Sequence, residues 1–61
     1  MKRFENETHT AEVCKSECNF FSVYSILIYH KTTKTYTMTG AYNKQSTAEY
    51  ALGLMVEHNT L

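Results

Sequence analysis

The segment from Ser22 to Tyr42, SVYSILIYHKTTKTYTMTGAY, constrains the fold more than any other part of the chain. Its first half is rich in β-branched and aromatic residues. In residues 35–42 the threonines and Ala41 alternate strictly with a second set made of Tyr36, Met38, Gly40 and Tyr42. Two such runs joined by a short polar connection predict a β-hairpin over about residues 20–42. The first strand is apolar on both of its faces, so each face needs a cover.

A helix is predicted after the hairpin. The sequence STAE fits a capping box, in which the Ser46 hydroxyl and the Glu49 carboxylate accept hydrogen bonds from each other's backbone N–H groups. An apolar stripe with helical spacing follows, made of Ala48, Ala51, Leu52 and Met55. We therefore expect a helix over about residues 47–58. The fold class is α+β, with an antiparallel sheet of two or three strands packed in two layers against this helix.

Residues 1–18 carry a weaker signal. The stretch ETHTAEVC alternates weakly between apolar and polar positions, so this region is either an extra strand or a flexible arm. No repeat, low-complexity tract or linker divides the 61 residues. The chain is therefore expected to form a single small α+β domain over residues 1–61.

The hairpin register assigns the side chains to faces, because side chains alternate along a strand. The expected pairs on one face are Tyr29–Tyr36, Leu27–Met38, Ser25–Gly40 and Val23–Tyr42. We expect the helix to cover this face. The opposite face would then carry a row of large side chains beside the threonines of the second strand.

This row is the predicted partner or dimer interface, since exposing an isoleucine forfeits about 1.5–3 kcal/mol of burial and a contiguous apolar patch usually marks an interaction surface. Three coverings are open: residues 1–18 folding across the sheet, a second copy of the chain, or a foreign protein. The interface residues are Tyr24, Ile26, Ile28, His30, Thr37 and Thr39.

Charge argues against polyanionic partners. Six basic and six acidic side chains give a formal net charge of zero, whereas phosphate contacts dominate nucleic-acid affinity. The alternative function is binding of single-stranded nucleic acid, in which sheet tyrosines stack on bases and Lys31, Lys34 and Tyr36 make the contacts.

The longest apolar run is too short to cross a bilayer, and the N-terminal residues lack the apolar region of a secretory signal. No membrane interaction is expected, and the expected location is cytoplasmic, the host cytoplasm if the gene belongs to a phage.

No pattern of residues predicts catalysis. The only metal-like spacing is Cys14-x3-Cys18, and the histidines at positions 9, 30 and 58 are scattered, so no metal and no other cofactor are expected. The only two glycines are far apart, which excludes a glycine-rich phosphate loop. The sequence thus predicts a small non-enzymatic module, a regulator or inhibitor that occupies a protein partner and forms a homodimer. Such modules are typical of phages and mobile elements.

Overall fold

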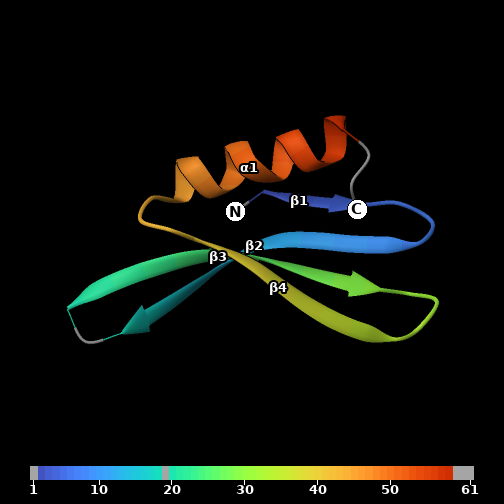
Figure 1. The fold of residues 1–61 in the computed structure, drawn as a ribbon, viewed down its shortest axis with the longest axis horizontal. Coiled ribbons are helices and arrows are strands. Elements are labelled where there is room, and N and C mark those ends of the chain that lie inside the picture. The colour runs from blue at the N-terminus through green and yellow to red at the C-terminus, as the bar shows by residue number, and fades with distance from the viewer. Residues whose placement is uncertain (1, 19, 59–61) are drawn as a thin grey trace.

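The computed structural model describes residues 2–18 and 20–58 and contains four antiparallel strands followed by one helix (Figure 1). The elements are β1 (Arg3–Glu5), β2 (His9–Cys18), β3 (Phe21–His30), β4 (Thr35–Tyr42) and α1 (Gln45–Glu57). The strands lie in the sheet in chain order, β1-β2-β3-β4. The α+β class is confirmed, although the sheet has more strands than the expected two or three. Residues 1–18 supply two strands instead of an arm.

The helix packs on one face of the sheet, and the core lies between the two layers (Figure 1). The buried hydrophobic side chains of the described residues are Ala11, Val13, Ile26, Ile28, Ala48 and Leu52. The expectation that α1 covers the face of Leu27 and Tyr29 is therefore wrong, because α1 covers the isoleucine row.

Strand β2 explains this choice of face. In the ladder between β2 and β3, Val13 lies opposite Ile26 and Ala11 lies opposite Ile28, so the isoleucine row extends into a continuous apolar surface. On the other face Leu27 lies opposite Glu12. Covering that face with a helix would bury a carboxylate, which is costly without a partner. The hairpin alone could not reveal this difference, because the deciding residues belong to β2.

A β-bulge divides β4. The pairs Tyr29–Tyr36 and Leu27–Met38 are confirmed, but the register shifts by one residue beyond Ile26. Gly40 lies at this irregularity with a φ of +81°, a left-handed conformation that favours glycine. The expected pair Val23–Tyr42 is wrong, because Tyr42 lies opposite Tyr24 and turns to the helix side, where it packs against the core. The expected pair Ser25–Gly40 falls at the irregularity and is not part of the ladder.

The predicted apolar stripe of α1 is confirmed, but the predicted capping box is wrong. Ala48 and Leu52 are buried, and Ala51 and Met55 pack against the core. The helix begins at Gln45, and its N-cap residue makes no side-chain capping bond. The Glu49 carboxylate instead accepts hydrogen bonds from the Gln45 side-chain amide, at 3.2 Å, and from the backbone N–H of Lys2, at 3.0 Å. Glu49 thus ties the helix to the segment before β1.

Hydrogen bonds also join the two turns at the opposite end of the sheet. The Asn6 side-chain oxygen accepts hydrogen bonds from the backbone N–H groups of Thr8, at 2.9 Å, and His9, at 2.6 Å, and so shapes the β1–β2 turn. The Lys31 ammonium donates to the Glu5 carboxylate and to the Asn6 carbonyl, both at 2.7 Å. The β3–β4 turn is therefore anchored to the β1–β2 turn.

Candidate protein-binding face

Most of the interface predicted from the hairpin lies under or beside the helix. Ile26 is 0% exposed and Ile28 is buried, so neither side chain can contact a partner. Tyr24 is half-buried against the core. The half-buried ring of His30 lies 3.0 Å from the Thr37 hydroxyl, measured from Nε2 to Oγ1.

The prediction of Ile26 and Ile28 as contact residues is therefore wrong. Its physical cause is the apolar contribution of β2, which makes the isoleucine row the seat of α1. Of the six predicted interface residues, Thr37 and Thr39 are the two that are exposed.

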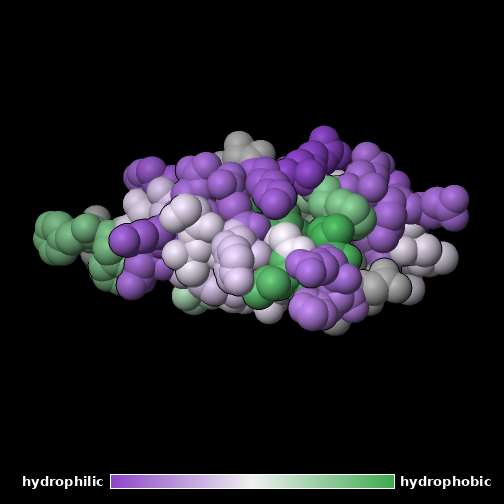
Figure 2. Space-filling view, turned by 90° about the horizontal axis from the view of Figure 1, so that it is seen from above, coloured by the Kyte–Doolittle hydropathy of each residue, from purple (hydrophilic) through white to green (hydrophobic). Residues whose placement is uncertain are grey.

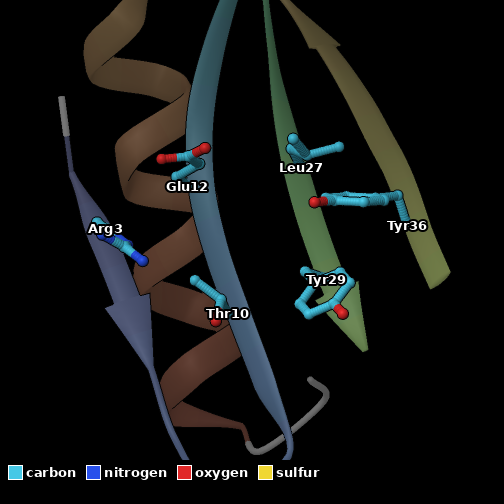
Figure 3. Close-up of a pocket in the computed structure, with 6 residues that line it drawn as sticks. All are labelled: Arg3, Thr10, Glu12, Leu27, Tyr29 and Tyr36. Atoms are coloured by element: carbon cyan, nitrogen blue, oxygen red, sulfur yellow. The ribbon is translucent and has the colours of Figure 1, made fainter. Parts of the chain in front are cut away.

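The side of the sheet opposite α1, here named the open face, carries a shallow hollow. Its volume is about 180 Å³, and it is lined from all four strands by Arg3, Thr10, Glu12, Leu27, Tyr29 and Tyr36. Figure 3 shows these side chains in front of the sheet with α1 behind it. The ladder explains why they share a face, because Arg3 lies opposite Glu12 and Glu12 lies opposite Leu27.

Aromatic and aliphatic side chains form the β3–β4 half of the open face. The rings of Tyr29 and Tyr36 lie 4.7 Å apart, centroid to centroid, and are tilted by 43°. Beside them Met38 lies opposite Leu27. Tyr36 is 67% exposed and Met38 is 58% exposed. These are large side chains to leave in water, and tyrosine in particular combines an apolar ring with a polar hydroxyl, as interface residues often do.

The β1–β2 half of the hollow is charged. Arg3 and Glu12 are exposed cross-strand partners, and Figure 3 shows both on the side of the hollow away from Tyr36. A cation and an anion next to two aromatic rings suit a ligand surface that is apolar at one end and bears charged or hydrogen-bonding groups at the other.

The residues of the nucleic-acid alternative lie in the β3–β4 turn and at the start of β4. Lys31 forms an ion pair with Glu5. The hydrogen bond from Lys31, and to a smaller extent its positive charge, lowers the pKa of the Glu5 carboxyl. Lys34 is exposed in the β3–β4 turn, and Tyr36 is exposed on the open face. The sheet tyrosines do not form one stacking platform, since Tyr42 packs on the helix side.

Among residues 2–18 and 20–58, no group of three or more histidine, cysteine, aspartate or glutamate side chains could hold a metal ion. The rings of His9 and His30 lie 4.7 Å apart, edge to face. Cys14 is half-buried, and burial, followed by the charge of Glu12, raises the pKa of its thiol. The Cys18 side chain lies outside the described part of the structure.

An exposed aromatic pair at the tip of the β2–β3 hairpin was not predicted. Phe20 is fully exposed, and Phe21 is also exposed. Figure 2 shows an apolar projection at the end of the molecule where this hairpin turns. The sequence carried a signal for it, because adjacent side chains at the end of a strand point to opposite faces and cannot both enter a one-sided core.

Comparison with known proteins gives no relative. No protein-family model matches the chain, and no curated protein or solved structure is detectably similar to it. Within the described residues, no helix combines the length and the apolar character that crossing a membrane requires. The surfaces of the chain itself therefore have to indicate its function.

Proposed function

We propose that this protein is a non-enzymatic protein-binding module, a regulator or inhibitor that acts by occupying a protein partner through its open face. The exposed pair of Tyr36 and Met38, beside Tyr29 and Leu27, carries this proposal. Burying such side chains contributes about 25 cal/mol for each Å² of apolar surface removed from water. No other element among the described residues covers this face, so a partner would gain that burial.

The dimensions of the hollow favour a partner's side chain over a substrate. Small-molecule sites usually enclose about 300–1,000 Å³, whereas this hollow has a volume of about 180 Å³ and is open to solvent. One aromatic or branched aliphatic side chain would fill it against Tyr29 and Tyr36. Flanking acidic and basic groups of the partner would face Arg3 and Glu12. The partner is therefore a protein surface with an apolar anchor between charges of both signs.

Selection from a random peptide library on the immobilised protein tests this proposal. We expect peptides with one aromatic or aliphatic anchor and at least one flanking charged residue. In NMR titrations, the selected peptides should shift the amide resonances of β3 and β4 around Leu27, Tyr29, Tyr36 and Met38. Met38→Lys should weaken peptide binding at least about tenfold, because it places a charge in the apolar half of the face.

Thr47→Lys is the matched control. Thr47 is exposed on α1, away from the open face, so this variant adds the same charge and should bind the peptides as the wild type does. Peptides that shift only resonances of α1 or of the hairpin tip would overturn the assignment of the face. A second titration uses a fluorescent oligothymidine. Binding that falls steeply with salt and is lost in Tyr36→Ala would instead favour the nucleic-acid alternative.

A further inference from the structure

The extended part of β4 lies between two residues in the left-handed region. Lys34 has a φ of +58° and Gly40 has a φ of +81°. Each lies three positions from Thr37, so the straight segment of residues 35–39 has its centre at Thr37. Within the described part of the chain β4 is an edge strand, since the sheet order ends with it, and its residues 35–41 are all exposed.

This edge lacks the protection that edge strands usually carry. An unpaired edge offers a row of backbone N–H and C=O groups to any other strand, and natural proteins guard it with charges, proline or irregular backbone. The sequence TYTMTGAY contains no charged residue and no proline, and its only irregularity is the bulge at Gly40. The helix packs across β2, β3 and β4, but residues 35–41 of β4 all remain exposed, so α1 does not cover the straight segment of this edge.

The segment Thr35-Tyr36-Thr37-Met38-Thr39 is nearly the same read in either direction. We propose that β4 pairs antiparallel with β4 of a second copy about a two-fold axis at Thr37, so that two molecules share one continuous sheet. Thr37 then lies opposite Thr37 of the second copy, Tyr36 lies opposite Met38, and Thr35 lies opposite Thr39. Threonine pairs and aromatic–aliphatic pairs are among the favourable cross-strand combinations.

This symmetry is the reason to assign the edge to a second copy and not to an unrelated strand. A two-fold contact requires a self-complementary surface, and the register around Thr37 provides one without any repulsive pair. The nearest charge is Lys34, which falls opposite Gly40 of the second copy, where both strands leave the straight segment. Tyr36 and Met38 belong to both surfaces, but Thr37 lies only at the edge and Glu12 only on the open face, so variants at these two positions let the two proposals fail independently.

Charge exchange at position 37 tests the pairing. Sedimentation velocity of the wild type over the micromolar range should show a reversible dimer. Thr37→Lys and Thr37→Glu should each weaken it at least about tenfold, because like charges would lie directly opposite each other. An equimolar mixture of the two variants should restore dimerisation to within about threefold of the wild type. Each variant alone carries only one sign of charge at position 37, so restoration in the mixture can come only from contact between copies.

Three further variants complete the test. Thr47→Lys, on the exposed side of α1, should dimerise as the wild type does. Glu12→Lys changes the open face but leaves β4 intact, so it should still dimerise. If Glu12→Lys lost the dimer while the variants at Thr37 kept it, the contact would lie on the open face and the proposal would be overturned. A wild type that stays monomeric at high micromolar concentration, or a mixture that stays monomeric, would also overturn it. Peptides selected on the open face should still bind Thr37→Lys, which separates this proposal from the first.

Discussion

Tyr24 of β3 lies opposite Tyr42 of β4. If the register of the pair Ile26–Thr39 continued along the strands, Tyr24 would instead lie opposite the preceding residue, Ala41. The extra residue is accommodated by the bulge at Gly40, and it divides β4 into two parts with different roles. Before the bulge, the strand presents Tyr36 and Met38 to the open face. After the bulge, Tyr42 turns to the helix side and closes the core beside α1.

Gly40→Ala should destabilise the protein by about 2–3 kcal/mol, because a side chain in the left-handed region costs about 1–2 kcal/mol and the space for a Cβ is also missing. At Gly40 that atom would overlap the ring of Tyr42. The free energy of unfolding from urea titration measures the loss. A variant as stable as the wild type would contradict the bulge geometry.

Gly53→Ala should have the opposite sign. Gly53 lies in the middle of α1 with an ordinary helical backbone, where glycine costs about 0.5–1 kcal/mol relative to alanine. The nearest atom to an added Cβ is the Lys2 Nζ, at 3.3 Å, which is the end of a flexible side chain and can move. Urea unfolding should show a gain of about 0.5–1 kcal/mol. A loss of stability would mean that Lys2 is fixed in place.

The local elements of this fold could be predicted, but the arrangement of the layers could not. Alternation in residues 35–39 and the apolar stripe of α1 identified a strand and a helix, because periodicity is a local property. The choice of the covered face depended on Ala11 and Val13, which lie in the weakly patterned N-terminal region. The bulge depended on a single glycine, and glycine within a strand also occurs at tight bends and where another backbone approaches closely.

The same limit applies to the candidate site. The sequence correctly predicted the neighbours Tyr29–Tyr36 and Leu27–Met38, but it placed them under the helix and left Ile26 in water. One wrong choice of the covered face therefore assigned the buried side chains to the surface and the exposed ones to the core. Arg3 and Glu12 were missed because their position beside the tyrosines requires the pairing of β1 with β2, and a strand of three residues leaves almost no pattern in a sequence.

Neighbouring residues on opposite faces test the layer arrangement. Ile26→Ala should cost about 2–5 kcal/mol, since Ile26 is fully buried against the helix side of the core. Leu27→Ala should cost about 1 kcal/mol, since Leu27 is half-buried on the open face. Urea unfolding of the two variants gives the comparison. A larger loss for Leu27→Ala would contradict the position of α1.

Ile26→Val provides a second measurement if Ile26→Ala does not fold. Removing one methylene from a full core should cost about 0.5–1.5 kcal/mol, which a domain of this size can sustain. Met38→Ala is the surface control, because a side chain that is 58% exposed has little burial to lose. Its free energy of unfolding should stay within about 0.5 kcal/mol of the wild type.

Acid should weaken the contact between the helix and the segment before β1. Hydrogen bonds from the Gln45 side chain and then from the backbone N–H of Lys2 lower the pKa of Glu49 from its usual value of 4.5. A carboxyl whose pKa is lower in the folded state stabilises the protein above the unfolded pKa, and this contribution is lost as pH falls through the folded pKa. The difference in urea midpoint between the wild type and Glu49→Gln should therefore be largest at neutral pH and shrink below pH 4.5.

Gln45→Ala removes the first donor without changing the charge, so it should reduce the same pH dependence in part. A difference that is constant with pH would show that these two hydrogen bonds do not depend on the ionisation of Glu49.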